Sequence, residues 1–247
     1  GLDGVDLHEA RRRGIAVTYT PDAPAPAVAE LTVGLMFSLL RRIQEANVAM
    51  HQGVWHRLFG RQIGDVQIGL IGVGRIGSRV VSLLASLGVQ DILATDITPL
   101  PQSHGKTRIQ SVSLEQLLRE SDVISVHTPL TPATRNLIRR SELLSMKPDA
   151  LLINTARGGI VNEADLYSVM QNGHLGGAAV DVFTEEPYQG PLSQLDRCLL
   201  TSHMGSMSVT SRTTMEIEAT REAIRFITGE PLESPVPDEE YSLQAES

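Results

Sequence analysis

A glycine-rich turn between a strand pattern and a helical pattern constrains the fold of this chain more than any other feature. The short apolar run 66–71 leads directly into Gly72 to Gly77, which has the spacing G-x-G-x-x-G. Apolar residues then recur at helical spacing over 75–87, and a second apolar run, 91–95, ends at Asp96. This order predicts a strand, a tight turn, a helix and a second strand of one parallel sheet.

Each glycine of this turn has a mechanical role in a dinucleotide-binding site. Gly72 permits the tight turn, Gly74 lets the backbone approach a pyrophosphate, and Gly77 lets the helix pack closely on the strand. The free N–H groups at the start of the helix attract phosphates. A carboxylate at Asp96 binds ribose hydroxyls and repels a 2′-phosphate, which favours NAD over NADP. Glycines alone also mark ordinary turns, so the prediction depends on strand, helix and acid occurring together.

Apolar runs and helical patterns alternate, with short connections, from residue 66 onward. Most of the runs are continuously apolar, which is typical of parallel strands covered on both faces. Ser113 opens a capping-box pattern and Asn162 precedes first-turn acids, so both mark helix starts. The alternation predicts an α/β fold with a Rossmann-type, doubly wound parallel sheet. The predicted strands are 66–71, 91–95, 107–110, 122–126, 150–154, 177–182 and 198–201.

The two ends of the chain lie outside this alternation. Residues 1–20 predict a helix and then a strand at its end, Ile15 to Tyr19, before a proline-rich turn and a long apolar helix over 28–43. Residues 209–228 form a second long helical pattern that ends at a glycine. The acidic tail 230–247, with prolines at its start, is predicted to lack regular structure.

Composition narrows the functional class. A chain of 247 residues, 41% of them hydrophobic, can bury a sizeable core. Its net charge of −8 argues against a surface for nucleic acid or anionic membranes. No run approaches the roughly 20 apolar residues of a membrane span. One cysteine, Cys198, excludes a disulfide within the chain and a multi-cysteine zinc site. We therefore expect a cytoplasmic protein that binds neither nucleic acid nor membrane.

Three polar segments follow predicted strands, at the edge where a dinucleotide fold places its substrate. In Asn154 to Gly159, an arginine precedes two glycines, and a guanidinium binds a carboxylate bidentately. Asp181 to Pro187 carries acids just past a strand, and Thr201 to Ser206 carries a histidine. Each segment also has a plain interpretation, as a surface arginine, as solvated acids, or as a hydrogen-bonded histidine.

His203 differs from the other histidines because it follows an apolar strand and precedes a glycine turn. A nearby carboxylate would fix its tautomer and keep a proton available for a carbonyl oxygen. The sequence contains neither H-x-x-x-H, nor a comparable ligand spacing, nor G-x-S-x-G. It therefore predicts neither a metal site nor a serine nucleophile.

The ordered motifs resemble the D-isomer-specific 2-hydroxyacid dehydrogenases over nearly the whole chain. The resemblance implies an NAD-binding Rossmann domain at 27–209. It also implies two parts of a flavodoxin-like substrate domain, one at 1–26 and one, a C-terminal helix and tail, at 210–247. NAD is the implied cofactor, and a small 2-hydroxy or 2-keto acid is the implied substrate. The motifs are Gly72 to Gly77 with Asp96, His127 to Pro132, Asn154 to Gly159, Asp181 to Pro187, and Ser202 to Gly205.

The resemblance also assigns roles to residues. Arg157 would bind the substrate's carboxylate and carbonyl, Glu186 would pair with His203, and His203 would exchange a proton with the carbonyl oxygen. The segment from His127 would line the adenosine end, and Asp181 would bond the nicotinamide carboxamide. The implied cofactor-binding set is Gly72, Gly74, Arg75, Ile76, Gly77, Asp96, His127, Thr128, Pro129, Ala156, Asp181, Gly205 and Thr32, with no metal ligand.

Two departures from the family pattern matter. Ser202 stands where family members usually have proline before the histidine, which alters rigidity more than chemistry. Family members also begin with a longer segment, and this chain starts at Gly1 without methionine, so we expect it to be part of a longer polypeptide. Trp55 falls in a region that family members use for dimer contacts, and the resemblance implies a homodimer. A plain packing role for Trp55 is equally consistent with the sequence.

The leading hypothesis is an NAD-dependent oxidoreductase acting on a small D-2-hydroxy acid or its 2-keto acid. Residues 188–192 and 215–219 favour a phosphoglycerate dehydrogenase-like member, with 3-phosphoglycerate as a candidate substrate. Glyoxylate and hydroxypyruvate reductases share the same three catalytic residues, and Asp96 argues against those that prefer NADPH. Two alternatives remain, an NAD-binding corepressor that works through protein contacts and a catalytically incomplete NAD-binding fragment.

Overall fold

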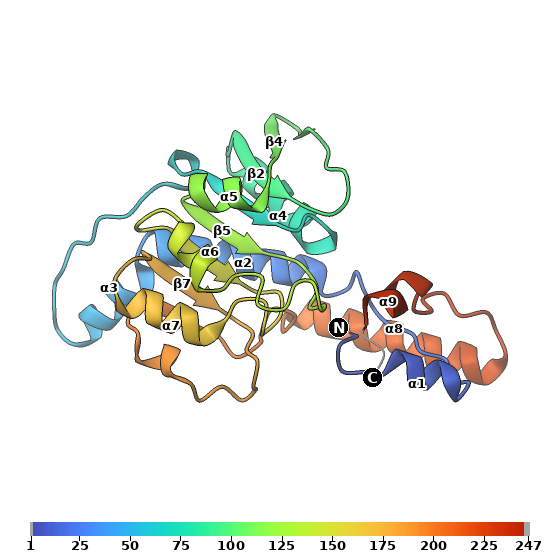
Figure 1. Ribbon diagram of the computed structural model, residues 1–247. Helices are drawn as coiled ribbons and strands as arrows, with labels where there is room; N and C mark the ends of the chain where they lie inside the picture. The colour runs from blue at the N-terminus through green and yellow to red at the C-terminus, as the bar shows by residue number, and fades with distance from the viewer. Residues whose placement is uncertain (1, 245–247) are drawn as a thin grey trace.

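An eight-stranded sheet forms the centre of the larger lobe (Figure 1). The computed structural model describes residues 2–244. The strand order is β3-β4-β2-β1-β5-β6-β7-β8, and every pairing is parallel except that of β3 with β4. The predicted Rossmann-type α/β class is therefore confirmed. The strands are β1 (Ile68–Ile71), β2 (Asp91–Thr95), β3 (Ser103–His104), β4 (Thr107–Ser111), β5 (Val123–Val126), β6 (Leu151–Asn154), β7 (Gly177–Val180) and β8 (Cys198–Leu200).

The strand order reverses at β1, and this reversal positions the functional site. From β1 the chain builds outward through β2 and β4, and then returns to add β5 on the other side of β1. In register, Ile71 at the end of β1 lies between Thr95 of β2 and Val126 of β5. The loops after β1 and β5 therefore meet at one edge, which is where open parallel sheets bind ligands.

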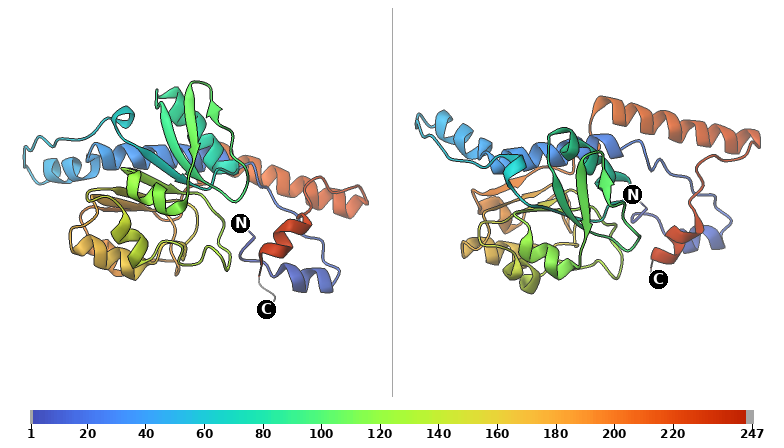
Figure 2. Two further views of the ribbon diagram at one scale, coloured as in Figure 1. Left: turned by 45° about the horizontal axis from the view of Figure 1, so that its top comes forward. Right: turned by 90° about the horizontal axis from the view of Figure 1, so that it is seen from above.

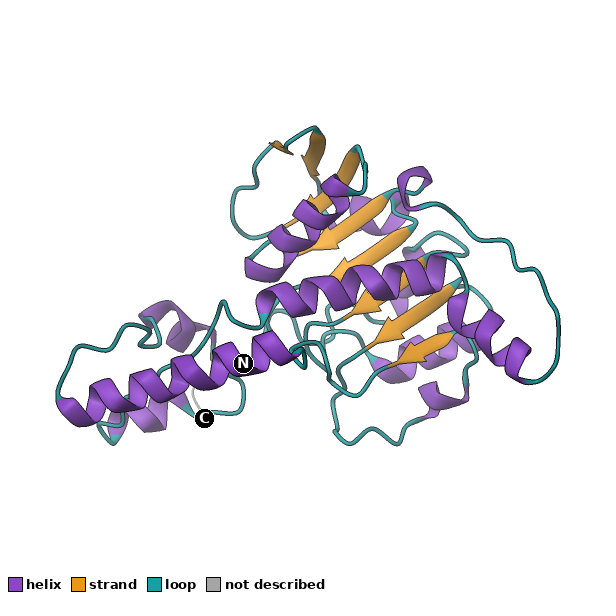
Figure 3. Cartoon of the chain, turned by 180° about the vertical axis from the view of Figure 1, so that it is seen from behind, coloured by secondary structure: helices purple, strands orange, loops and turns teal. Residues whose placement is uncertain are grey.

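Helices cover both faces of the sheet. On one face lie α2 (Ala25–Leu40) and α4 (Arg75–Ser86), which Figure 3 shows crossing in front of the strands. On the other face lie α5 (Leu114–Glu120), α6 (Arg140–Ser145) and α7 (Glu163–Gln171). Four central strands (β1, β5, β6 and β7) are buried along their full length because helices cover both faces.

The two ends of the chain form a separate small lobe (Figure 2). It contains α1 (Leu7–Arg12), α9 (Asp238–Leu243) and much of the long helix α8 (Val209–Thr228). Leu7, Val236 and Tyr241 form its apolar cluster, which is distinct from the two clusters of the sheet lobe. The division into domains at 1–26, 27–209 and 210–247 stays a prediction; residues 1 and 245–247 lie outside the described part.

Several local predictions were wrong. Residues 15–19 make only an isolated bridge, Thr18 to Pro235, because, α1 apart, their backbone hydrogen-bonds only to the short segment 234–236 of the described chain. The tail is partly regular, because the buried Tyr241 ring anchors α9 and receives the Arg11 guanidinium 3.6 Å above its centroid. The helix expected at 28–43 ends at Leu40, and α3 (Ile43–His51) follows it.

No helix within residues 2–244 combines the length and apolar character that crossing a bilayer requires.

Candidate active site

The glycine-rich turn between β1 and α4 is packed so tightly that two of its glycines leave no room for a side chain. A Cβ atom on Gly77 would lie 2.3 Å from the Gly72 carbonyl oxygen. One on Gly72, where φ is +92°, would lie 2.9 Å from the His127 backbone. A Cβ atom on Gly74 would meet nothing within 4 Å. The space at Gly74 is therefore open, as a bound pyrophosphate requires.

The first turn of α4 leaves its backbone N–H groups without a side-chain partner, because its N-cap residue is Gly74. Such N–H groups and the helix dipole favour an anion at this position. Ile76 packs on the apolar cluster beneath α4, and the Arg75 guanidinium lies 3.4 Å from the Asp22 carboxylate. The residues of the turn thus fit the pyrophosphate of a dinucleotide.

Asp96, directly after β2, is held through both of its carboxylate oxygens. Oδ2 accepts from the Val73 backbone N–H at 2.7 Å, and Oδ1 accepts from the backbone N–H and hydroxyl of Thr98, both at 2.9 Å. Partial burial raises the pKa of Asp96, but these hydrogen bonds outweigh it and leave the pKa below its ordinary value. Asp96 is therefore ionised beside the turn, which suits ribose hydroxyls and disfavours a 2′-phosphate.

His127, Thr128 and Pro129 follow β5, with the His127 backbone against the glycine turn. The His127 ring is hydrogen-bonded through Nε2 to Ser125 Oγ at 2.9 Å. Burial lowers the pKa of His127 to about 4, so the ring is neutral at physiological pH. His127 Nδ1 and Thr128 Oγ1 are buried without a hydrogen-bond partner in the described chain, whereas Pro129 is exposed. Two unpaired polar atoms next to the turn are consistent with a ligand contact there.

The loop after β6 fixes the backbone around Arg157. The Asn154 side chain donates to the Arg157 carbonyl oxygen at 3.0 Å and accepts from the Ala156 N–H at 3.1 Å. A Cβ atom on Gly158 would lie 2.0 Å from the Phe183 backbone, so this loop packs directly on the segment that leads to Glu186. The loop is therefore closed on itself and fixed against its neighbour.

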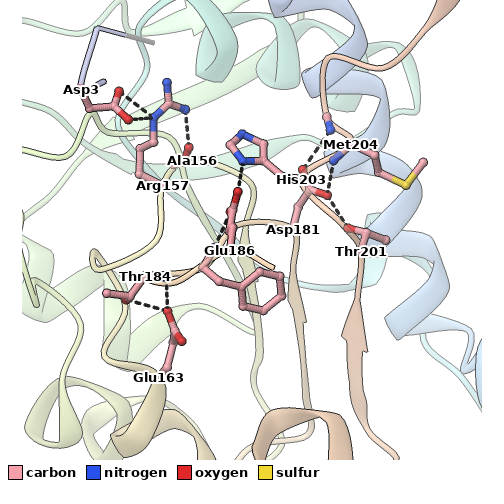
Figure 4. Close-up of polar contacts among 12 residues, drawn as sticks. Asp3, Ala156, Arg157, Glu163, Asp181, Thr184, Glu186, Thr201, His203 and Met204 are labelled. Carbon is pink, nitrogen blue, oxygen red and sulfur yellow. Dashed lines mark hydrogen bonds and ion pairs between the residues drawn. The ribbon is translucent and has the colours of Figure 1, made fainter. Parts of the chain in front are cut away.

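The Arg157 side chain contacts a residue that the sequence did not indicate. Arg157 Nε donates to both carboxylate oxygens of Asp3, at 3.0 and 3.1 Å, and Nη1 donates to the Ala156 carbonyl oxygen at 2.7 Å. Asp3 precedes α1 of the small lobe, whereas Arg157 follows β6 of the sheet lobe. Figure 4 shows the two side chains facing each other. Nothing in the segment around Asp3 marks it as a functional residue.

Glu186 and His203 form a hydrogen-bonded pair (Figure 4). Nδ1 of His203 lies 2.8 Å from Glu186 Oε2, and the other carboxylate oxygen accepts from the Phe183 N–H at 3.0 Å. Within residues 2–244, His203 Nε2 makes no hydrogen bond, so it is available to a ligand. The Glu163 carboxylate steadies the Glu186 segment, because it accepts from the N–H and hydroxyl of Thr184 at 2.6 and 2.7 Å.

The charges around Glu186 keep it ionised. Partial burial raises its pKa, but the hydrogen bonds from His203 and Phe183 and the charges of His203 and Arg157 lower it more. The net pKa of Glu186 lies below its ordinary value. A charged carboxylate at Nδ1 favours the tautomer that leaves Nε2 facing the ligand, and stabilises the imidazolium once it is protonated.

Asp181 organises the loop that carries His203. This carboxylate is almost completely buried. Oδ1 accepts from the Thr201 hydroxyl at 2.5 Å and from the Met204 N–H at 2.9 Å, and Oδ2 accepts from the Gly205 N–H at 2.9 Å. His203, held between these anchors, has the left-handed φ of 51° that non-glycine residues seldom adopt. Sequence reasoning placed Asp181 at the cofactor and missed this anchoring contact.

Thr32 lies beneath the site rather than at its surface. Its side chain is completely buried, and its hydroxyl is hydrogen-bonded to the Val28 carbonyl oxygen at 2.8 Å and to Thr155 Oγ1 at 2.7 Å. A role for Thr32 next to the cofactor stays a prediction, and in this arrangement it would act through Thr155.

A cavity of about 600 Å³ opens beside the Glu186–His203 pair. Its walls are mainly apolar, and Phe183 and Tyr188 stack there with ring centroids 4.2 Å apart.

The described residues contain no group of three or more His, Cys, Asp or Glu side chains able to hold a metal ion.

Known proteins match this chain along most of its length. Residues 33–205 match the family profile of the D-isomer specific 2-hydroxyacid dehydrogenase NAD binding domain. The chain is 38% identical to the glyoxylate reductase of Thermofilum pendens, with 93% of this chain and 70% of that protein aligned. It is 36% identical to the Homo sapiens glyoxylate reductase/hydroxypyruvate reductase, with 95% and 74% aligned. It is 37% identical to the D-3-phosphoglycerate dehydrogenase of Methanocaldococcus jannaschii, with 83% and 40% aligned.

Solved structures also superpose on most of this chain. The TT0316 protein from Thermus thermophilus superposes with a TM-score of 0.88 at 37% identity, over 96% of this chain and 76% of that one. D-lactate dehydrogenase from Aquifex aeolicus, complexed with NAD and lactic acid, superposes with a TM-score of 0.85 at 29% identity, over 93% and 74%.

Proposed function

The chain belongs to the D-isomer specific 2-hydroxyacid dehydrogenases and uses NAD, and from this premise we propose that it reduces glyoxylate and hydroxypyruvate with NADH. The glyoxylate reductase and the glyoxylate reductase/hydroxypyruvate reductase described above share 70% and 74% of their length with it, at 38% and 36% identity. The phosphoglycerate dehydrogenase shares 40% of its length, so 3-phosphoglycerate stays a prediction. The family and the cofactor expected from the sequence motifs are confirmed.

The observation that carries the proposal is the His203–Glu186 pair with Arg157 beside it. The 2.8 Å contact at Nδ1 leaves Nε2 free, and the charges of both His203 and Arg157 act on Glu186. Figure 4 shows the three side chains gathered from three different loops. We assign His203 as the proton donor, Glu186 as its charged partner and Arg157 as the group that binds the carboxylate and carbonyl of the 2-keto acid.

In reduction, His203 Nε2 gives its proton to the carbonyl oxygen as that oxygen becomes negative. Arg157 stabilises the same developing charge and aligns the carbonyl through the substrate carboxylate. Glu186 stabilises the protonated imidazole before the transfer and keeps Nε2 directed at the substrate after it. NADH, when bound, supplies the hydride that reaches C2, and NAD⁺ accepts it in the reverse direction. In oxidation, His203 takes the hydroxyl proton back.

For the cofactor we propose the residues predicted from the sequence. Gly72 to Gly77 would hold the pyrophosphate and Asp96 the adenosine ribose, because the turn is open at Gly74 and Asp96 is ionised beside it. His127 to Pro129 would line the adenosine end. Ala156, Asp181 and Gly205 would lie near the nicotinamide, and Asp181 has one lone pair of Oδ2 left after its contact with Gly205.

We also propose that the active protein is a homodimer. The irregular segment 52–62 presents Trp55 and Phe59 to solvent with 76% and 94% of their surfaces exposed. Exposed aromatic side chains on one segment are typical of an interface. Light scattering of Trp55→Ala should then give a smaller particle than the wild type; equal masses at equal concentration contradict this assignment.

Rates of NADH oxidation with glyoxylate, hydroxypyruvate, pyruvate and 3-phosphohydroxypyruvate test the function. We expect glyoxylate and hydroxypyruvate to have the highest kcat/KM. A preference for the phosphorylated acid would transfer the assignment to phosphoglycerate dehydrogenase chemistry. NADH binding without turnover of any of the four contradicts an enzymatic role for this polypeptide.

A further inference from the structure

We propose that Asp3 is a positioning residue, which holds the Arg157 guanidinium away from Glu186 and with its outer edge open to the substrate carboxylate. This inference rests on the proposed function of Arg157. Asp3 lies far from Arg157 in the sequence and comes from the other lobe, yet both of its carboxylate oxygens accept from Arg157 Nε.

The contact leaves most of the guanidinium free. Asp3 uses Nε, and the Ala156 carbonyl oxygen uses one N–H of Nη1. Within the described residues, Nη2 makes no hydrogen bond. The end of the fork formed by Nη1 and Nη2 therefore remains able to bind a carboxylate bidentately. Asp3 thus holds the inner side of the fork without occupying its outer edge.

Among residues 2–244, the Arg157 side chain makes no hydrogen bond to a residue outside its own loop other than those to Asp3. Asn154 fixes the backbone through the Arg157 carbonyl oxygen and the Ala156 N–H, and the Nη1 bond is made to the neighbouring residue of the same loop. An arginine side chain has several rotatable bonds, so a fixed backbone alone leaves it many directions. Asp3 supplies the contact from outside the loop.

Glu186 is the competing partner. Arg157 lowers the pKa of two carboxyl groups, Asp3 and Glu186. For Asp3, burial raises the pKa, and the charge and hydrogen bond of Arg157 lower it more. If Asp3 lost its charge, Glu186 would become the stronger attraction for the guanidinium. Glu186 would then be shared between Arg157 and His203, which weakens both substrate binding and the support of the imidazole.

Asp3 itself is on a fixed segment. The Val5 N–H donates to the Leu2 carbonyl oxygen at 3.1 Å, and Gln244 Nε2 donates to the carbonyl oxygens of Leu2 and Val5 at 2.9 and 3.1 Å. The turn that carries Asp3 is therefore tied to the end of α9. The Asp3–Arg157 contact joins this turn to the sheet lobe.

The test compares Asp3→Asn with Asp3→Glu and with Asp238→Asn, which removes another aspartate of the small lobe, the partner of Arg11. Asp3→Asn should raise KM for glyoxylate about tenfold or more, the loss expected for a misplaced charge-assisted contact. It should also move the pH profile of kcat/KM, because Glu186 no longer serves His203 alone, while NADH affinity and Tm stay near wild type. Asp3→Glu should recover part of the loss, and Asp238→Asn should match the wild type.

Three results would overturn the inference. A lower KM in Asp3→Asn would mean that Asp3 competes with the substrate carboxylate. Unchanged KM and an unchanged pH profile would mean that Asp3 does not act on Arg157. A loss in Asp238→Asn equal to that in Asp3→Asn would mean a general effect of the small lobe. Wild-type turnover is measured first, so failure of the proposed function is distinguished from failure of this inference. The Arg157 Nε–H signal in nitrogen-15 NMR, exchange-protected only in wild type and Asp3→Glu, gives a readout independent of turnover.

Discussion

The residues proposed to hold the cofactor, Gly72 to Gly77 and Asp96 (the cofactor region), are built into the fold in a different way from those proposed to act in catalysis, Arg157, Glu186 and His203 (the catalytic region). The cofactor region comes from one continuous strand–helix–strand unit, and its main elements are backbone N–H groups and the absence of side chains. The catalytic region consists of side chains from three loops, each fixed by a separate buried or charged contact. The first is a local property of the chain, whereas the second depends on the whole fold.

The two regions are therefore sensitive to different kinds of substitution. In the cofactor region, adding a single methyl group does harm because the backbone itself is the binding surface. In the catalytic region, removing one of the contacts that fix a loop lowers activity, because the side chain that the loop carries is then misplaced. Variants of the two regions should therefore separate NAD binding from turnover.

The largest separation is expected for His203→Ala. Loss of the proton donor should lower kcat by roughly 10²- to 10⁴-fold, which is the usual contribution of a general acid–base group. NADH affinity, measured by fluorescence titration, should stay within about twofold, because no contact of the glycine turn changes. A kcat near the wild-type value would remove His203 from the mechanism.

Gly158→Ala and Gly77→Ala form a matched pair, because a Cβ atom at either position would collide with backbone. Gly158→Ala should displace the Arg157 loop from the Phe183 segment and lower kcat/KM about 10²-fold, as misplacement near 1 Å can do. Gly77→Ala should chiefly weaken NADH binding. Gly74→Ala, whose methyl group has open space, should leave Tm unchanged and still weaken NADH binding. Equal losses of NADH affinity in Gly158→Ala and Gly77→Ala would contradict the separation of the two regions.

A smaller effect is expected for Asp96→Ala. Removing the ionised carboxylate takes away its hydrogen bonds to the ribose and its repulsion of a 2′-phosphate. The ratio of kcat/KM for NADH to that for NADPH should fall about tenfold or more. Steady-state rates with both cofactors measure it, with Asp91→Ala, at the first residue of β2, as the control. An unaltered ratio means that Asp96 does not recognise the ribose.

The titration of His127 is expected to affect stability rather than activity. The pKa of His127 in the folded chain is about 4, below its value of 6.5 in the unfolded chain. As the pH falls below 6.5, His127 is therefore protonated in the unfolded state but not yet in the folded state. Stability is therefore unaffected above pH 6.5 and decreases between pH 6.5 and about 4, by at most about 3 kcal/mol. Chemical denaturation across this range should show a shallower decrease in His127→Asn than in the exposed control His51→Asn. Parallel curves would show that His127 is protonated in the folded state.

The same contrast explains how much the sequence predicted. The cofactor region was predictable because strand, glycines and acid follow one another within 31 residues of sequence, from 66 to 96. The parallel strands were predictable because they are continuously apolar. Helix α3 was missed; none of its residues is buried, so it contributes nothing to the core of the sheet lobe. Strand β3 was missed because it has two residues.

The motifs indicated the residues proposed to be catalytic, but they did not indicate most of the contacts that anchor those residues. Asp3 acts on Arg157 from 154 residues away, and Glu163 acts on the Glu186 segment through Thr184, which is 21 residues away. A single polar residue has no spacing or periodicity, so only the fold reveals which partner it has. The expected strand at 15–19 failed for a related reason. Val17 and Tyr19 pack on the apolar cluster of the small lobe, but no neighbouring strand of the described chain pairs with this segment beyond one bridge.

Together the two regions are proposed to transfer a hydride from NADH to the carbonyl carbon of a 2-keto acid, which yields the D-2-hydroxy acid. The direct measurement is the reaction of hydroxypyruvate with NADH deuterated at C4 of the nicotinamide, on the transferable face, with chiral analysis of the product by mass spectrometry. We predict D-glycerate carrying deuterium at C2, formed by the wild type and reduced at least 10²-fold in His203→Ala. L-glycerate, or NADH that binds without any deuterated product forming, would contradict hydride transfer to form a D-2-hydroxy acid.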